Sequence, residues 1–336
     1  MSRFVFAVAL SFMTIGFMGT NILLADEQNS PVFRLGMVGL DTSHVIRFTE
    51  WLHDPQNASG CRVVAGFPGG SPDIESSISR VEGYTNELRE KHGVEIVANV
   101  EELCSKVDGV LITSVDGRPH LEYAKIVFAA RKPVFIDKPM AASLPDVIEI
   151  FRLAKEGGIP CWSSSSFRYS KNMLEATSGK IGTILGGITY GPCHREPHHP
   201  DLYWYGIHTA EALYTLMGPG CVSVTRTYSD GTDVIVGTWK DGRLGIFRGG
   251  SSPAPGQSLK AGFIAFGSED VYHGQPDNYD GLLREIVKFF QTGRPPIAPA
   301  ETIELFAFMS AADESKAKGG ASVELRPLIE QASAAK

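Results

Sequence analysis

The chain has 336 residues, of which 43% are hydrophobic and 21% are charged. This composition is typical of a globular protein with enough material for two domains. The formal net charge of −7 excludes the basic surface that nucleic-acid binding requires. The five cysteines are widely spaced without a CxxC pair, which argues against a zinc ribbon and leaves one disulfide as an open alternative.

The first 25 residues differ from the rest of the chain. Arg3 precedes an apolar run over residues 4–19, and Ala25 stands before the acidic Asp26. This order is typical of a secretory signal peptide, so we expect an exported, periplasmic protein that has lost residues 1–25. Leu23 fits the small-residue rule for cleavage poorly, and an uncleaved membrane anchor is the alternative.

Short apolar segments alternate with amphipathic ones over the next part of the chain. The pattern predicts strands over residues 33–40, 61–67, 94–97, 110–113 and 134–136, and helices over 45–52, 84–93, 101–107 and 120–130. Strands and helices that alternate at this spacing favour a Rossmann-type, doubly wound parallel sheet. We therefore predict an α/β fold whose N-terminal domain spans residues 32–142.

The sequence pattern changes in residues 143–336, where runs rich in β-forming residues are separated by Gly and Pro turns. Strands are predicted over residues 184–190, 222–228, 234–239, 243–247 and 259–266, and helices over 209–217 and 282–290. We expect an α+β domain with a large, mostly antiparallel sheet, and a last helix, about 301–318, that packs back toward the N-terminal domain. An exposed sheet face often pairs with a second copy, which predicts a homo-oligomer.

Lys138 stands at the carboxyl end of a predicted buried strand, in the run Phe135-Ile136-Asp137-Lys138-Pro139. Ser143 then opens a helix as an N-cap, and the pair Gly157-Gly158 ends it. A cation between a strand end and a helix start faces the ligand crevice of a doubly wound sheet. Lys138 is therefore a predicted site residue.

Four short motifs follow one another along the chain. They are Asp137-Lys138-Pro139, Phe167-Arg168-Tyr169, Gly206-Ile207-His208 followed by Glu211, and the segment from Gly293 to Ser315. In this order they resemble the Gfo/Idh/MocA family, typified by glucose–fructose oxidoreductase and inositol dehydrogenase. The resemblance covers nearly the whole chain after the expected signal peptide.

The resemblance implies sugar or cyclitol chemistry at the junction of a Rossmann half and a β-sheet half. It implies that Lys138 helps to hold the nicotinamide and the substrate hydroxyl, that His208 shuttles the proton, and that Glu211 completes the catalytic set. The implied cofactor is NAD or NADP, with expected contacts at Gly39, Asp41, Thr42, Ser43, His44, Ser114, Asp137 and Lys138. The expected contacts of a carbohydrate substrate are His120, Arg168, His194, His198 and Tyr205.

The turn after the first predicted strand departs from the Gly-x-Gly-x-x-Gly pattern of a dinucleotide site. It reads Gly39-Leu40-Asp41-Thr42-Ser43-His44, so Asp41 and His44 replace the second and third glycines. A carboxylate beside two phosphates is unfavourable by ~1 kcal/mol even under aqueous screening. The second predicted strand also ends without the acid that would hold ribose hydroxyls, so we expect an atypical dinucleotide site.

A divalent metal is the alternative occupant of the crevice. Asp41, His44, His199 and His208 combine carboxylate and imidazole, which suits Zn, Mn or Fe. Such a metal would polarise a sugar carbonyl or hydroxyl and support elimination or hydrolysis without nicotinamide. Three hypotheses follow: an exported sugar oxidoreductase, a metal-assisted carbohydrate lyase or hydrolase, and a non-catalytic sugar-binding protein.

Overall fold

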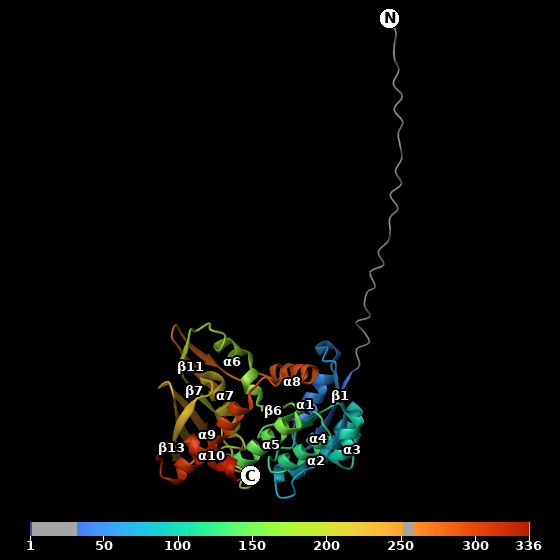
Figure 1. Ribbon diagram of the computed structural model, residues 1–336, viewed down its shortest axis with the longest axis horizontal. Helices are drawn as coiled ribbons and strands as arrows, with labels where there is room; N and C mark the ends of the chain where they lie inside the picture. The colour runs from blue at the N-terminus through green and yellow to red at the C-terminus, as the bar shows by residue number, and fades with distance from the viewer. Residues whose placement is uncertain (2–31, 251–258, 336) are drawn as a thin grey trace. The chain divides into compact units, whose positions relative to one another are not determined.

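The computed structural model describes residues 1, 32–250 and 259–335 (Figure 1). The expected signal peptide, apart from Met1, lies outside the described residues. In the part of the chain that the structure describes, no helix is both long and apolar enough to span a membrane.

The first sheet is parallel throughout, with strand order β3-β2-β1-β4-β5-β6. Its strands are β1 Phe33–Val38, β2 Cys61–Phe67, β3 Glu95–Ile96, β4 Gly109–Ile112, β5 Val134–Asp137 and β6 Cys161–Ser164. The strand order reverses between β1 and β4, and ligands of doubly wound sheets bind outside the carboxyl ends of the strands at such a point.

Helices connect the strands of this sheet in the predicted alternation. They are α1 His44–His53, the short η1 Pro55–Asn57, α2 Glu75–His92, α3 Val100–Lys106, α4 His120–Ala129 and α5 Leu144–Gly157. Ser143 caps α5 by accepting the Asp146 N–H at 3.2 Å, and Gly158 ends the helix with a φ of 62°. Both ends of α5 therefore follow the predicted signals.

The second sheet is mostly antiparallel, as predicted, with order β12-β11-β7-β10-β9-β8-β13. Its strands are β7 Ile184–Pro192, β8 Cys221–Ser229, β9 Thr232–Trp239, β10 Leu244–Gly250, β11 Gly262–Gly267, β12 Val271–Gly274 and β13 Val323–Glu324. Only the pair β7 and β10 is parallel among the described strands of this sheet.

The remaining helical elements pack against the two sheets and against one another. They are η2 Ser166–Tyr169, α6 Lys171–Ala176, α7 Gly206–Met217, α8 Asp280–Thr292, α9 Pro299–Ala317 and α10 Leu325–Ala334. Helix α7 packs on β7 and β10, and α9 contacts both β8 and α5. Helix α8 returns to the first sheet, where Phe290 lies 5.5 Å from Phe33 and Phe289 lies 5.9 Å from Trp162 between ring centroids.

The first sheet extends beyond the predicted domain boundary at residue 142. It includes β6, whose four residues are all buried although two of them, Ser163 and Ser164, are polar. The sequence gives no strand signal there because the segment has neither alternation nor a run of apolar residues. Helix α2 is also longer than the predicted 84–93, because its first turns carry mainly serines and charged residues.

Candidate active site

Lys138 and His208 meet where the first sheet joins the second part of the chain. Lys138 follows the last residue of β5, and His208 lies in the first turn of α7. Burial lowers the pKa of His208 well below its usual value, and the nearby Lys138 ammonium adds to this effect. Burial also lowers the pKa of Lys138, against the opposing influence of Asp137. His208 is therefore neutral at neutral pH and can accept a proton.

Asp137 and His44 form a buried pair beside Lys138. His44 Nδ1 is hydrogen-bonded to Asp137 Oδ2, and the other oxygen of Asp137 accepts the Lys138 N–H at 2.8 Å. Burial alone would raise the pKa of Asp137, but His44 and Lys138 outweigh it and lower that pKa. The His44 ring stacks on Phe48 at 5.1 Å and meets Tyr279 edge-on at 4.9 Å. The pair thus holds the α1 terminus on the end of β5.

Tyr205 brings two histidines and the lysine to one face. Its ring centroid lies 5.7 Å from Lys138 Nζ, 6.0 Å from the His208 ring and 5.1 Å from the His194 ring. The predicted residues Lys138, His208, His194 and Tyr205 therefore lie together, and Tyr205 is partly exposed. An exposed aromatic ring with polar neighbours is suited to stacking on a sugar.

A buried carboxylate supports His208 from behind. Ser165 Oγ lies 2.6 Å from His208 Nδ1, so Nε2 is the nitrogen that can reach a substrate. Glu211 accepts the Ser165 N–H at 2.7 Å, the Ser164 hydroxyl, and Arg168 Nε at 2.9 Å. Glu211 is only 3% exposed, so all of these contacts lie in the protein interior. Glu211, predicted as catalytic, is instead placed to position Ser165 and His208.

Arg168 does not reach toward a substrate as predicted. Its guanidinium lies between Glu211 and Glu301, with Nη2 at 2.7 Å from Glu301. It thereby connects η2, α7 and α9. A buried arginine between two carboxylates is a structural tie, since removing either partner would leave a buried charge without compensation.

The turn from Gly39 to His44 is held by neighbouring loops. Gly39 has a φ of 88°, and a Cβ there would lie 2.3 Å from the Cβ of Ser114, so only glycine fits. Asp41 is fully buried, where it accepts the Val115 N–H at 2.9 Å and the Ser77 hydroxyl at 2.5 Å. Burial raises the pKa of Asp41. Asp41 therefore joins β1 to the β4–α4 loop and to α2.

Thr42 and Ser43 are the last residues of this turn before α1, and the N-cap side chain does not cap the helix. Thr42 Oγ1 accepts the His44 N–H at 3.4 Å, and Ser43 is the N-cap residue of α1 but makes no capping hydrogen bond with its side chain. Ser43 is exposed, whereas Thr42 is buried. Of the two, only Ser43 presents its hydroxyl to solvent.

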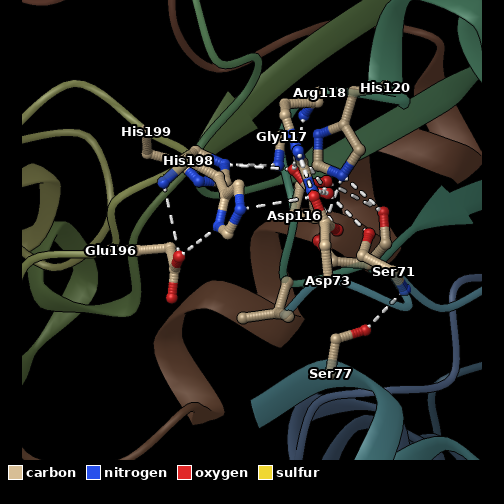
Figure 2. Close-up of polar contacts among 12 residues, drawn as sticks. Ser71, Asp73, Ser77, Asp116, Gly117, Arg118, His120, Glu196, His198 and His199 are labelled. Carbon is tan, nitrogen blue, oxygen red and sulfur yellow. Dashed lines mark hydrogen bonds and ion pairs between the residues drawn. The ribbon is translucent and has the colours of Figure 1, made fainter. Parts of the chain in front are cut away.

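A second polar cluster, the crevice network, lies at the carboxyl ends of β2 and β4. We define it as Ser71, Asp73, Asp116, Arg118, His198 and His199. These residues lie in the β2–α2 loop, the β4–α4 loop and the loop between β7 and α7, and Figure 2 shows their side chains close to one another.

Asp116 is the centre of the crevice network. It accepts Arg118 Nη2 at 2.8 Å and the Ser71 hydroxyl at 2.5 Å, and His199 Nε2 lies 3.2 Å from it. Burial would raise the pKa of Asp116, but His199, Arg118 and Ser71 together lower it far below its usual range. Arg118 also makes two bonds to Asp73, at 2.7 and 2.8 Å. The network thus ties two loops of the first sheet to each other.

The two network histidines bring the loop from the second sheet onto the first. His199 Nε2 accepts the Gly117 N–H at 3.1 Å, and the His199 side chain is buried. His198 Nδ1 lies 2.6 Å from Glu196, and its Nε2 lies 3.5 Å from Asp73. His198, expected to contact substrate, therefore contacts an acid of the β2–α2 loop (Figure 2).

His120 is a core residue, contrary to its predicted contact with substrate. It is fully buried, with Nδ1 3.2 Å from the Met140 carbonyl and Nε2 2.7 Å from Ser114 Oγ. Burial lowers the pKa of His120, so the ring is neutral and its nitrogens are used in holding two loops together. Ser114 shares this structural role, since it also packs against Gly39.

The predicted metal set is wrong, because its four members face different partners. His44 contacts Asp137, Asp41 contacts Ser77, and His199 contacts Gly117, while His208 contacts Ser165. Among the residues that the structure describes, no three His, Cys, Asp or Glu side chains form a group that could hold a metal ion.

Several residues of this region cannot be predicted from the sequence. Ser165 was not predicted because it follows the unrecognised strand β6, and Tyr279 because it lies far along the chain, at the start of α8. Asp116 and Arg118 stand beside the predicted His120, but their partner Asp73 lies in another loop. Nothing in the local sequence of either loop indicates that pairing.

A parallel Rossmann-type sheet and a mostly antiparallel second sheet, with a Lys–His pair at their junction, define a two-part α/β fold. Residues 33–164 match the model of the Gfo/Idh/MocA family, described as an oxidoreductase family with an NAD-binding Rossmann fold. The predicted resemblance is thus confirmed for residues 33–164, which are similar to that family.

Individual relatives agree with this assignment. An uncharacterized oxidoreductase of Escherichia coli, YhhX, is 30% identical over 121 residues, which cover 32% of this chain and about a third, 34%, of that relative. A probable dehydrogenase from Thermotoga maritima superposes with a TM-score of 0.71 at 20% identity, covering 88% of this chain and 99% of its own. A myo-inositol dehydrogenase from Lactobacillus casei, solved with NAD(H) and myo-inositol, gives 0.68 at 15% identity, covering 87% and 96%. The solved structures show that the fold extends beyond the matched segment.

The residues of this chain do not fit a dinucleotide in the way that the fold usually holds one. A pyrophosphate needs backbone N–H groups at the turn after β1. Here the Gly39 N–H donates to Phe67 O at 3.0 Å, the Leu40 N–H donates to Pro68 O at 2.7 Å, and the Val115 N–H donates to Asp41. The N–H groups of Gly39 and Leu40 in this turn are thus already satisfied within the chain.

Proposed function

We propose that this chain is an enzyme that transfers protons on a sugar or sugar derivative, with Lys138 and His208 at the reacting end. The observation that carries the proposal is the meeting of these two residues at the junction of the two parts of the fold. The match of residues 33–164 to an oxidoreductase family supports an enzyme, and an inositol dehydrogenase among the structural neighbours supports a hydroxyl-rich substrate.

His208 would act as the base. Its lowered pKa keeps it neutral, and Ser165 on Nδ1 fixes the ring so that Nε2 can take a proton. A well-placed general base contributes about 10² to 10⁴ to a rate. The Lys138 ammonium, supported in its charged form by Asp137, would stabilise the oxyanion that the proton leaves behind.

The overall reaction has two candidates that begin with this proton transfer. The match of residues 33–164 to an oxidoreductase family supports hydride transfer, but the turn after β1 does not fit the dinucleotide that would accept the hydride. The crevice network favours a redox-neutral reaction instead. In that reaction His208 takes a proton from a carbon next to a carbonyl, and the C–H electron pair forms an enolate. Returning a proton to the other face gives an epimer, and loss of a neighbouring hydroxyl as water gives an elimination product.

The test follows sugars and sugar acids by NMR in D₂O, with and without added dinucleotide, so that either reaction is detected. We expect His208→Ala to lower turnover by ~10² or more, as for loss of a general base. His273→Ala, an exposed histidine on β12, is the matched control and should keep the wild-type rate. Wild-type rates in His208→Ala would contradict the proposal. Sugar binding without turnover, unchanged in both variants, would instead indicate a binding protein.

We also propose that the chain is exported. The support is the basic, apolar and small-residue order of residues 1–25. N-terminal sequencing of the protein from the native cell should begin at Asp26, whereas a sequence beginning at Met1 would indicate an anchor or no export.

A further inference from the structure

We infer that this chain does not take up a free nicotinamide dinucleotide, because its own side chains fill the crevice in which such a cofactor would lie. The inference rests on the proposed function and deepens it, since it requires a reaction at Lys138 and His208 that needs no hydride acceptor from solution. Three observations carry it.

The first observation is the position of Asp41. This residue replaces the second glycine of the phosphate turn, at the point where the backbone must approach the pyrophosphate. Its carboxyl group accepts the Val115 N–H at 2.9 Å and the Ser77 hydroxyl at 2.5 Å, and none of it is exposed. The Asp41 carboxyl oxygen therefore already accepts the Val115 N–H at the crevice. A phosphate oxygen that used this N–H would have to displace the carboxyl oxygen.

The second observation is the close approach of the β2–α2 loop to the same turn. A Cβ on Gly69 would lie 3.4 Å from the Cα of Gly39, so the backbones of the two loops are in contact. The hydrogen bond from Leu40 N–H to Pro68 O, at 2.7 Å, fixes this approach. In the usual arrangement the end of the second strand instead faces the adenosine ribose.

The third observation is the crevice network (Figure 2). Arg118 joins the β4–α4 loop to the β2–α2 loop through two bonds to Asp73, and Asp116 joins the same loops through Ser71. Opening the crevice for an adenosine would break these bonds and leave the buried Asp116 carboxylate without its partners. A buried charge that loses its partners is strongly destabilising, so the closed form is the stable one.

The loop from the second sheet adds to this closure. His199 is buried against Asp116 and Gly117, and His198 approaches Asp73. Admission of a dinucleotide would therefore require both the loops of the first sheet and this third loop to separate. The closure involves Asp41 and the network, and it leaves Lys138, His208 and Tyr205 out of the filled region.

The experiment uses the full purified chain in two assays. Chromatography of the denatured protein should release no NAD or NADP in either redox state. Calorimetric titration with NAD⁺, NADH, NADP⁺ and NADPH should show no saturable binding up to about 1 mM, the upper end of ordinary Michaelis constants. A stoichiometric dinucleotide in the extract, or saturable binding below that concentration, would overturn the inference.

Variants test whether the named residues cause the exclusion. Asp41→Gly combined with Arg118→Ala should gain saturable dinucleotide binding at least about tenfold tighter than the limit for the wild type. Asp41→Ala alone, which removes the carboxyl group from the crevice, carries the same prediction if circular dichroism shows the double variant to be unfolded. The exposed Asp230→Asn is the control and should gain nothing. No gain in any Asp41 variant would overturn the assignment to these residues.

Two separate measurements test the proposed proton transfer and the exclusion of the dinucleotide. Hydrogen exchange into a sugar in D₂O, present in the wild type and lost in His208→Ala, reports the proton transfer whether or not a dinucleotide binds. Dinucleotide binding with that exchange intact would remove only the inference. Absence of the exchange, of any turnover and of dinucleotide binding would remove only the proposed function.

Discussion

Glu211 is the residue that links the interior of the protein to His208. It binds the Ser165 N–H, and Ser165 Oγ in turn contacts His208 Nδ1 at 2.6 Å. A second residue that orients a base in this way lowers the freedom of the ring without touching the substrate. Lys138 and His208 can be predicted from sequence because each lies in a recognisable motif. The contact from Glu211 through Ser165 to His208 cannot be predicted from sequence, because Ser165 follows a strand that has no apolar pattern.

We predict that Glu211→Gln, which keeps the side-chain size, lowers kcat about tenfold, or roughly 1.4 kcal/mol in activation free energy. The amide holds Ser165 less firmly and leaves Arg168 with Glu301 as its remaining carboxylate partner. KM should stay within about twofold, because Glu211 does not face the substrate. Steady-state kinetics measure both constants, and Glu314→Gln on the outer part of α9 serves as the control. An unchanged kcat in folded Glu211→Gln would remove Glu211 from this role.

Helix α1 is attached to β2 through a histidine in its last turn. His53 Nε2 lies 3.1 Å from the Val63 nitrogen and 3.2 Å from the Val63 carbonyl oxygen, and the neutral ring can accept the Val63 N–H there. Burial, together with the charge of Arg62, lowers the pKa of His53 from 6.5 to about 4. The folded state therefore binds fewer protons at this site than the unfolded state between those two values.

From this sign we predict that the free energy of unfolding decreases as the pH falls from 6.5 toward 4, and that His53 contributes to the decrease. His53→Gln, which cannot titrate, should lose less stability than the wild type between pH 7.5 and pH 5. Urea unfolding at both pH values measures the difference. His273→Gln, on an exposed strand, is the control and should behave as the wild type. Equal losses in His53→Gln and the wild type would contradict the assignment.

The elements of the first sheet are largely predictable, because its strands are short apolar runs and its helices are amphipathic. The exceptions have a shared cause. The first turns of α2 and the strand β6 contain many serines, and their place is decided by tertiary contacts such as that of Ser77 with Asp41. Local pattern does not contain that information.

At the scale of the whole molecule, one face of the second sheet exposes apolar side chains. Leu185, Leu244 and Phe266, from β7, β10 and β11, are 55%, 52% and 38% exposed around a hollow of about 590 Å³. Leu244 and Phe266 both pair in register with Gly186, so the three side chains surround one point of the sheet. Apolar patches of this kind on a sheet are often covered by a second copy.

We therefore predict a homo-oligomer that forms through this face. Leu244→Glu should shift the molar mass measured by light scattering after size exclusion toward that of the monomer. The reason is that a carboxylate at the patch would be desolvated on association. Leu174→Glu, an exposed leucine on α6, is the control. A monomeric wild type, or an unchanged mass in Leu244→Glu, would contradict the prediction.

The two-part architecture is predictable, because the sequence changes from alternating strand and helix patterns to a run of strand patterns. The closed crevice is not predictable. Asp73 and Arg118 lie in different loops, and His199 comes from beyond β7, so their meeting depends on the finished fold. Sequence indicates that the turn at Asp41 is unusual, and only the structure shows what takes the place of the expected ligand.

Helix α8 has a consequence for how the chain is made. Phe33 and Trp162 are covered by side chains of α8, which is synthesised more than a hundred residues after β6. A chain that lacks α8 leaves these apolar side chains of the first sheet uncovered. The N-terminal portion therefore completes its folding only when α8 is present. A gene fragment ending at residue 164 should yield aggregates rather than a usable miniature protein.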